Sequence, residues 1–517
     1  MSANDVAGTL QPEFPRHINL LKVAIIFATL MQVLDMTIAN VALPHMRAAL
    51  GANQDTISWV LTSYIVASAI AMPVTGWLAD KLGRRRLYLW SVGCFVIASV
   101  LCGISTNITE MVIFRLVQGV SGAFLTPLAQ TVLLDYTPPE KRSQAMAMFG
   151  MGVILGPILG PIIGGALTES ANWRWVFFVN VPIGLAAFGG LWLLLPDVKR
   201  PPRSLDLWGF ALLALGLAAF QLMLDRGQSE DWFSSIEIWI ELGVAITAFW
   251  IFVIHLLSAR NPLYSRVILR DRNLVIGTLL MANVGFVLTT SMALLPIMLE
   301  GLFGYPVLDT GKLLAARGIG VLFTMAIAAQ LMKLIDPRLL VAAGLGIIAL
   351  TFWDMTGWTL DQGWYSMAAN GFFQGLGIGL LFVPISTMAF ATLPPEERTD
   401  ASGIVNLARS VGSSVGISIV MTYLARGTSR SHEILGGYIT EARLPIDPQT
   451  MIPADSLRDM AMALVNAEVD RQAAMIGFLD SFYLAMVVTL CVLPLSLLVK
   501  RSSAIGGPPV TAADLGH

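Results

Sequence analysis

Residues 57–105 read ISWVLTSYIVASAIAMPVTGWLA, then DKLGRRR at 80–86, then LYLWSVGCFVIASVLCGIS. Two apolar runs, each near the roughly 20 residues that a helix needs to cross a bilayer, flank a short loop rich in arginine. A bilayer core offers no water to the backbone, so such runs satisfy their hydrogen bonds as helices. The stretch therefore predicts a hairpin of two membrane-spanning helices.

The composition of the whole chain agrees with this pattern. Of its 517 residues, 56% are hydrophobic and only 13% are charged, whereas soluble domains carry roughly 25% charged residues. The net charge of −2 provides no basic field for nucleic acid, and three cysteines exclude a disulfide scaffold. The sequence predicts an all-α polytopic membrane protein.

Fourteen segments are long and apolar enough to be membrane spans. Their expected cores are 21–41, 57–79, 87–105, 108–134, 145–167, 175–195, 207–224, 237–257, 274–299, 312–333, 338–357, 364–389, 402–424 and 476–499. The seventh and eighth spans are the weakest predictions, because Asp206, Asp225 and Glu241 lie close to their ends. Without this pair, twelve spans would remain.

Lysine and arginine are concentrated in alternate loops. If the N-terminus is cytoplasmic, the short outside loops hold only Arg47, Arg174, Arg226 and Lys312, and the short inside segments hold most of the others. Cytoplasmic loops carry an excess of basic residues. Both termini are therefore expected in the cytoplasm.

One loop is unusually long. Residues 425–475 are expected outside the membrane, and Leu457, Met460 and Leu464 recur at helical spacing within 456–471. Two interpretations stay open. The segment is either a surface helix resting on the membrane interface or a docking surface for an extracytoplasmic partner.

Polar residues gather on one face of the first span. Thr29, Gln32, Asp35, Met36 and Asn40 share that face at helical periodicity, and a charge inside a membrane is costly enough to need a reason. Because a low dielectric favours the protonated form of a carboxylate, Asp35 is a candidate site for loading and releasing a proton. The alternative is a structural carboxylate paired with a neighbouring helix.

The fourth span carries a second buried charge. Arg115, Gln118, Gly119 and Gly122 fall on one side of it. Arginine stays protonated, but it can stabilise a nearby carboxylate or hold a polar network. We expect Arg115 either to couple to the acid or to brace two helices.

The fifth span reads GVILGPILGPIIGG from Gly152 onward. With Gly156, Gly160 and Gly164 it forms a ridge at four-residue spacing, which lets another helix approach closely. Pro157, like the second proline of the motif, removes a backbone hydrogen bond and softens the helix. Two interpretations of this glycine ridge stay open: it serves only helix packing, or it forms a hinge used in a transport cycle.

Further polar residues are expected to line a substrate cavity. The expected cavity residues are Gln32, Met36, Asn40, Gln118, Asn370, Gln374, Arg317 and Arg409. The two arginines lie inside the tenth and thirteenth spans, and each is as consistent with a brace between helices as with contact to substrate.

No cofactor or metal is expected. Gly311 and Lys312 do not form a phosphate-binding loop, because the required glycine five positions earlier and the following Ser or Thr are missing. The five histidines do not cluster with cysteines or acids. If the protein pumps a solute, the energy must come from an ion gradient.

These motifs resemble those of the major facilitator superfamily. GWLADKLGRRR, from Gly76 to Arg86, resembles the loop after its second helix, and FRLVQGVSGA at 114–123 resembles its fourth-helix motif. The glycine ridge looks like its antiporter motif. Three further stretches are similar to 14-helix drug:proton antiporters of the EmrB type: LDMTIANVALP at 34–44, NWRWVFFVNVPIG at 172–184 and LMLDRGQSEDWFSS at 222–235.

The resemblance implies the major facilitator fold, with two six-helix bundles, two extra helices between them and a central cavity with alternating access. The implied segments are a cytoplasmic N-terminus at 1–20, an N-terminal bundle at 21–195, the inserted pair with its linkers at 196–273, a C-terminal bundle at 274–499 and a cytoplasmic tail at 500–517.

The resemblance also assigns roles by matching position. Asp35 would be the proton-coupled acid and Arg115 its relay partner. The cytoplasmic gate would contain Gly76, Asp80, Gly83, Arg84 and Arg85. The antiporter hinge would contain Gly152, Gly156, Pro157, Gly160 and Gly164.

We therefore expect a proton-driven antiporter that exports hydrophobic or amphipathic drugs across the bacterial inner membrane. The resemblance implies a periplasmic membrane-fusion adaptor and an outer-membrane channel as partners. A dedicated exporter of one lipid, siderophore or metabolite is the alternative. A scaffold or sensor is disfavoured, because it has no need of an isolated Asp35. No enzymatic activity is expected, since no nucleophile–base pair appears.

Overall fold

The computed structural model describes residues 17–197, 204–438 and 455–500. Within these ranges the chain is helical and contains no strand, which confirms the predicted all-α class. The terminal segments predicted at 1–20 and 500–517 lie almost wholly outside the described residues.

All fourteen predicted spans are confirmed, including the weak pair. The first six spans are formed by α2 (Ile18–Ala49), α3 (Gln54–Ala71) with α4 (Thr75–Leu82), α5 (Arg84–Ile104), α6 (Ile108–Ala123) with α7 (Leu125–Asp135), α8 (Arg142–Ser170), and α9 (Trp175–Phe178) with α10 (Asn180–Leu194). The inserted spans are α11 (Leu207–Arg226) and α12 (Ile236–Ser258). After the short α13 (Arg266–Arg270) come α14 (Arg272–Gly301), α15 (Val307–Leu334), α16 (Pro337–Met355), α17 (Trp364–Ala391), α18 (Arg398–Gly437) and α19 (Asp455–Leu497).

Local sequence signals set where several spans begin. The Asn53 side chain accepts a hydrogen bond from the Thr56 backbone N–H at 2.7 Å at the start of α3, and Asp206 accepts one from Gly209 at 2.9 Å at the start of α11. Such caps satisfy backbone donors that the first helical turn leaves free. Between α4 and α5, Gly83 adopts a φ of +86°, which a residue with a side chain rarely adopts.

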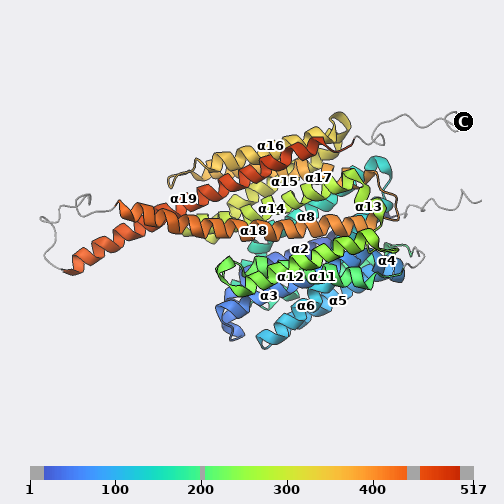
Figure 1. Cartoon of the computed structure of the whole chain (residues 1–517), viewed down its shortest axis with the longest axis horizontal. Coiled ribbons are helices and arrows are strands. Elements are labelled where there is room, and N and C mark those ends of the chain that lie inside the picture. Colours follow the sequence, from blue (N-terminus) through green and yellow to red (C-terminus); the bar gives the residue numbers. More distant parts are fainter. Residues whose placement is uncertain (1–16, 198–203, 439–454, 501–517) are drawn as a thin grey trace, which may run out of the picture.

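The helices form two groups joined by a few close contacts. In Figure 1, α2, α3, α5 and α6 lie on one side of the molecule and α14–α19 on the other. Helix α8 packs on α2 and also reaches α15 and α17 of the second group, while α7 and α4 contact α18. The inserted helices pack on each other, and α11 contacts both α3 and α18. The inserted pair therefore lies beside the seam between the two groups.

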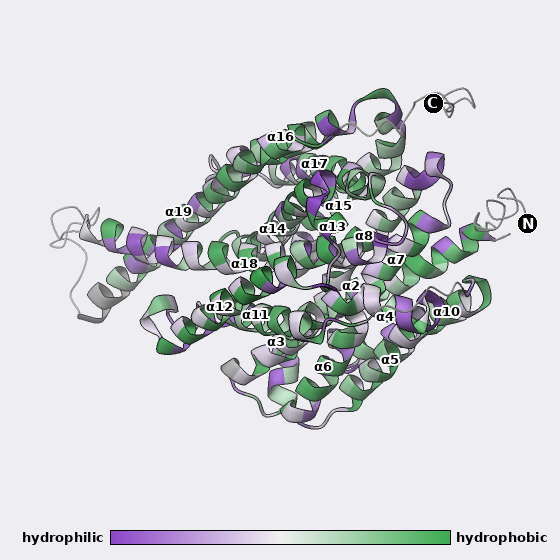
Figure 2. Cartoon of the chain, turned by 45° about the vertical axis from the view of Figure 1, so that its right-hand side comes forward, coloured by the Kyte–Doolittle hydropathy of each residue, from purple (hydrophilic) through white to green (hydrophobic). Residues whose placement is uncertain are grey.

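The outer surface is apolar. Trp90, Leu193, Ile236 and Trp250 expose 69%, 80%, 79% and 70% of their surface, which a soluble protein would not tolerate over so wide an area. Figure 2 shows hydrophobic residues along the lengths of the helices and hydrophilic ones gathered mostly near their ends and in the connections. The apolar sides of these helices suit a lipid environment.

The segment expected as a long loop is largely helical. Residues 425–437 continue α18, and 455–475 form the first part of α19. These two stretches, here named the helical arm, project beyond the other helices in Figure 1. His432 Nε2 lies 3.2 Å from Asp470 Oδ1 and links them. The helical periodicity predicted at 456–471 is confirmed, and that stretch runs without a break into the last span; residues 439–454 lie outside the described residues.

The glycine ridge of α8 packs directly on α2. A Cβ added at Gly152, Gly156, Gly160 or Gly164 would meet Ile26, Val33, Thr37 or Ile38 of α2, respectively. Thr37 Oγ1 also donates a 3.3 Å hydrogen bond to the Gly156 carbonyl. Helix α8 remains continuous through Pro157 and Pro161. The ridge thus permits close packing within the N-terminal bundle.

Replacing Gly160 by leucine should destabilise the protein. The new side chain would collide with Thr37, and overpacking of this kind costs about 1–3 kcal/mol. Gly165→Leu on the same helix is the matched control, because a Cβ there meets nothing within 4 Å. Thermal unfolding in detergent measures both variants. Equal melting temperatures for Gly160→Leu and Gly165→Leu would contradict the packing described here.

Candidate functional site

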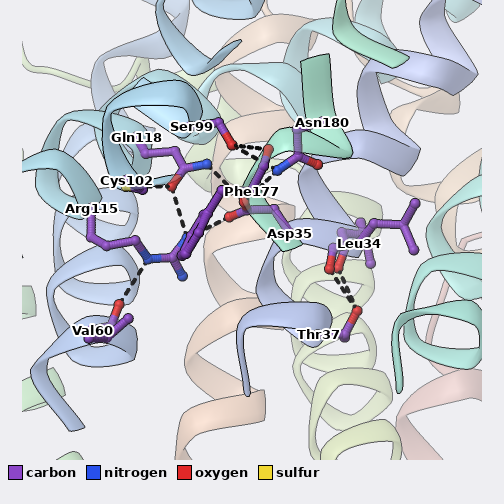
Figure 3. Close-up of polar contacts among 11 residues, drawn as sticks. Leu34, Asp35, Thr37, Val60, Ser99, Cys102, Arg115, Gln118, Phe177 and Asn180 are labelled. Carbon is purple, nitrogen blue, oxygen red and sulfur yellow. Dashed lines mark hydrogen bonds and ion pairs between the residues drawn. The ribbon is translucent and has the colours of Figure 1, made fainter. Parts of the chain in front are cut away.

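Asp35 lies at the centre of a buried polar network in the N-terminal bundle (Figure 3). Its Oδ2 lies 2.6 Å from Arg115 Nη1, and both side chains are fully shielded from solvent. Its Oδ1 accepts hydrogen bonds from Gln118 Nε2 at 2.8 Å and from Asn180 Nδ2 at 2.7 Å. Three donors from α6 and α10 thus converge on one carboxylate of α2.

Arg115 has further partners around its guanidinium. Nε donates to the Val60 carbonyl at 2.9 Å, and Nη1 donates to Gln118 Oε1 at 2.9 Å. The guanidinium carbon lies 4.6 Å from the centre of the Tyr64 ring and 5.7 Å from that of Phe177. Aromatic faces attract a cation most strongly where water is excluded. The arginine therefore joins α2, α3 and α6.

Glycines on α6 allow α6 and α3 to lie close enough for these contacts. A Cβ at Gly122 would lie 2.6 Å from the Tyr64 hydroxyl, and one at Gly119 would meet the Tyr64 carbonyl at 2.5 Å. The glycines beside Arg115 therefore allow α6 to approach α3. Behind the carboxylate, Asn180 Nδ2 also donates to Ser99 Oγ at 3.0 Å, which places α5 in the same network.

The expected cavity residues do not meet in one cavity. Gln118 is fully buried and belongs to the Asp35 network instead. Gln32 is buried and accepts a 2.7 Å hydrogen bond from Thr126 Oγ1, whereas Met36 and Asn40 are exposed on α2. The other four residues, Asn370, Gln374, Arg317 and Arg409, lie on α15, α17 and α18 in the other group of helices.

One of the expected gate residues, Arg84, lies where the two groups of helices meet. Arg84 forms an ion pair with Asp135 at the end of α7, and its Nη2 donates to Thr399 Oγ1 of α18 at 3.1 Å. Arg398 Nη1 reaches the other carboxylate oxygen of Asp135 at 2.9 Å. One acid of the N-terminal group is thus shared by two arginines, and both ties extend to the start of α18.

A second contact lies one layer deeper in the same seam. Gln130 Oε1 accepts hydrogen bonds from Ser402 Oγ and Asn406 Nδ2, each at 2.6 Å. Ser402 and Asn406 are buried on one face of α18, and Gln130 is buried on α7. Together with the pairs of Asp135, these bonds hold the two groups together at this end of the molecule.

The remaining gate residues support the turn between α4 and α5. Gly76 is buried in α4, Asp80 is half-buried on the same helix, and Gly83 adopts the positive φ described above. Arg85 donates to the Trp192 carbonyl, and its guanidinium lies 5.8 Å from the Trp192 ring centre. Arg85 therefore contacts α10 and not the seam.

Sequence reasoning missed several members of these networks. Asn180 lies inside the NWRWVFFVNVPIG stretch, and a buried asparagine in an apolar run was an available signal for it. Asp135 and Arg398 lie at span ends, where charged residues are ordinary, so no pattern separated them from other loop charges. Among the described residues, no group of three or more His, Cys, Asp or Glu side chains could hold a metal ion.

The sequence profile of the Major Facilitator Superfamily matches residues 25–417, which is most of the chain. The chain belongs to this superfamily. This transporter is 34% identical to the multidrug export protein EmrB of Escherichia coli (strain K12), over 94% of its own length and 96% of that protein. It is 32% identical to the fatty acid resistance protein FarB of Neisseria gonorrhoeae, over 95% and 96% of the two chains.

Solved structures share the fold of this transporter. The proton:xylose symporter XylE aligns with 94% of this chain and 99% of its own, with a TM-score of 0.59 and 13% identity. Human MFSD10 aligns over 91% and 99% of the two chains, with a TM-score of 0.57 and 16% identity. The protein is therefore an EmrB-type, multi-pass membrane transporter of the major facilitator fold.

The Asp35–Arg115 pair should behave as one energetic unit. Removing one partner of a buried ion pair leaves an uncompensated charge and costs about 3–5 kcal/mol, so Asp35→Asn and Arg115→Gln should each lower the melting temperature. The double variant should lose less stability than the sum of the losses in the two single variants. Thermal unfolding of all four forms in detergent tests this.

The neutral pair Gln32–Thr126 is a matched control in the same bundle, since its hydrogen bond carries no ion pair. Gln32→Leu, Thr126→Val and their double variant should show smaller shifts. Strictly additive losses for Asp35→Asn and Arg115→Gln would contradict the proposed coupling between the two charges.

Proposed function

We propose that this transporter is a proton-driven antiporter that exports hydrophobic or amphipathic drugs by alternating access. The observation that carries the proposal is the fully shielded Asp35–Arg115 pair. Burying a charge pair in the middle of a membrane bundle costs free energy. Protonation of an acid that joins three helices would change the contacts between those helices.

Protonation of Asp35 would remove the attraction that holds Arg115. The guanidinium stays charged, and it would keep the Val60 carbonyl, Gln118 and the ring of Tyr64 as partners. The hydrogen bonds from Gln118 and Asn180 would weaken at the same time, because a neutral carboxyl is a poorer acceptor. Loading a proton would therefore loosen α2 from α6 and α10.

Helix α2 offers a route from this site to the seam. Its residues on both sides of Asp35 pack on the glycine ridge of α8. On another side of α8, a Cβ at Gly150 would meet Phe382 of α17 and Met325 of α15, so α8 is in close contact with both groups of helices. A shift of α2 would thus displace the second group of helices through α8. The ion pairs of Asp135 with Arg84 and Arg398, which lie between the two groups, would then break or form and so open or close the inner end.

The energy available suits solute pumping. One proton moved through 100 mV releases about 2.3 kcal/mol, which supports a concentration ratio of roughly fiftyfold. A pH gradient would add to this. No nucleotide site is needed for such a cycle.

The breadth of substrates is proposed from relatives. EmrB of Escherichia coli and of Haemophilus influenzae are both named multidrug export proteins, which favours varied drugs. FarB is named a fatty acid resistance protein, which favours a dedicated lipid exporter as the second candidate. Sensitivity of a deletion strain to several unrelated compounds supports the first, and sensitivity to fatty acids alone supports the second.

We also propose that the protein lies in the bacterial inner membrane with both termini in the cytoplasm. An adaptor and an outer-membrane channel would then complete the export path. The helical arm would lie on the outer side, and it exposes Ile434, Met462 and Leu464, with 50%, 49% and 68% of their surfaces accessible. Apolar residues exposed on a projecting helix pair suit contact with another protein.

Asp35→Asn should abolish proton coupling. Purified protein in liposomes with an imposed pH gradient should release protons when substrate is added, and the variant should not, because an amide cannot take up the proton. Asp480→Asn, at an exposed acid on α19, is the matched control and should behave as the wild type. Equal proton release by Asp35→Asn would overturn the assignment.

Shortening the helical arm should abolish drug resistance in cells without abolishing transport by the purified protein. Residues 431–471 can be replaced by a short Gly-Ser turn, because Gly427 and Gly477 already pack against each other at the base of the arm. Resistance in cells should be lost while transport in liposomes persists. Ile434→Glu with Leu464→Glu, which keeps the arm, should weaken resistance in the same way. Loss of transport in both settings would show a structural role instead.

A further inference from the structure

A buried positive charge lies in the C-terminal group of helices. Arg317 on α15 exposes only 4% of its surface, and its Nη1 is shielded from solvent without a hydrogen bond to any described residue. Among the described residues, no acid forms an ion pair with it. Because arginine keeps its proton inside a protein, an uncompensated guanidinium in such a place calls for an anion.

The backbone of Arg317 is packed against α17. A Cβ added at Gly375 would lie 2.0 Å from the Arg317 carbonyl oxygen, and one added at Gly371 would lie 3.9 Å from the Arg317 Cβ. The side chain therefore starts from a tight interface between two helices. This position accounts for its low exposure and fixes the charge inside the group.

Arg317 lines a small cavity between α14, α15, α16 and α17. The other walls include Leu295, Leu299, Met355 and Trp358. The cavity has a volume of about 20 Å³, and one water molecule needs roughly 10–15 Å³. There is thus room for a single body close to water in size. A carboxylate or sulfate ion would be too large.

A water molecule alone is a poor occupant of this cavity. Buried waters make about three hydrogen bonds, whereas the walls beside Arg317 are formed by aliphatic, aromatic and thioether side chains. A neutral water would also leave the charge of the guanidinium uncompensated. A monatomic anion needs no directed hydrogen bonds, and a cation attracts it strongly where the dielectric is low.

The acid that precedes Met355 in α16 has other partners. Asp354 Oδ2 accepts hydrogen bonds from Asn370 Nδ2 at 2.7 Å and from Trp358 Nε1 at 3.1 Å, and the residue is exposed. The indole N–H of Trp358 is thereby engaged as well. Of the side chains that line the cavity, Arg317 is left to supply charge and donors to an occupant.

We propose that this cavity binds one monatomic anion, chloride in the cell, on the guanidinium of Arg317. Chloride is only slightly larger than water, so the size of the cavity selects it against polyatomic anions. The bound ion neutralises Arg317 as Asp35 neutralises Arg115 in the N-terminal group. This inference concerns the C-terminal group and does not depend on the proposed export of drugs.

Thermal unfolding of the purified protein in detergent tests the proposal. Chloride is replaced stepwise by gluconate at constant ionic strength, because gluconate is too large for the cavity. A ligand that binds only the folded state stabilises it, so the melting temperature should rise by about 1 °C for each tenfold increase in chloride above the dissociation constant. Arg317→Gln should lose this dependence, while Lys312→Gln, at an exposed cation on the same helix, should keep it.

A second variant keeps the arginine and fills the cavity. Gly371 lines the cavity, and a Cβ added there meets its neighbours at 3.7 Å or more, which is ordinary contact. The methyl groups of Gly371→Val would take the place of the anion, so this variant should also lose the chloride dependence. Gly346→Val on α16, where a Cβ meets nothing within 4 Å, is the matched control and should keep it.

Bromide locates the ion directly, because it scatters X-rays anomalously. In crystals soaked with bromide, the anomalous signal should place one ion beside the guanidinium of Arg317 in the wild type. The same position should hold no ion in Arg317→Gln or in Gly371→Val.

Any of three results would overturn the proposal. Equal melting temperatures of the wild type in chloride and gluconate would leave water as the occupant. An equal effect of chloride on the wild type, Arg317→Gln and Gly371→Val would reveal a general effect of salt. Stabilisation by sulfate as strong as that by chloride would place the anion outside this small cavity.

Discussion

The fully shielded pair of Asp35 and Arg115 is the constraint on which the N-terminal bundle depends. A carboxylate so far from water needs several donors, and α6 and α10 supply them through Arg115, Gln118 and Asn180. Each donor fixes the rotation and height of its helix relative to α2. The same bonds that make the acid tolerable also make its charge state matter for packing, because helices held by a charge are released when that charge is cancelled.

The two groups of helices differ in whether their buried arginine has an acidic partner. The first group pairs its interior arginine with an acid, while in the second no described residue forms an ion pair with Arg317. Helix α8 lies against both groups, with its glycine ridge on α2 and Gly150 against Phe382 and Met325 of the second group.

The fourteen spans could be predicted because crossing a bilayer requires length and hydropathy that few other segments possess. Asp35 and Arg115 could be singled out, since charges are rare inside spans. Their shared network with Asn180 and Ser99 could not, because which faces of α5 and α10 meet α2 is decided by packing between distant segments. The continuity of the arm with α18 and α19 could not be predicted, for a related reason. Its low hydropathy resembles a loop, yet pairing of His432 with Asp470 and packing of Gly427 on Gly477 accompany helices that continue past the membrane.

Helix α18 is a single element of 40 residues, from Arg398 beside the inner seam to Gly437 in the helical arm. At 1.5 Å per residue it is about 60 Å long. Moving as one rod, it works as a lever: a tilt of about 10° around its midpoint displaces each end by about 5 Å, in opposite directions. If α18 moves as one rod, a step that separates Arg398 from Asp135 at one end would displace the helical arm at the other end.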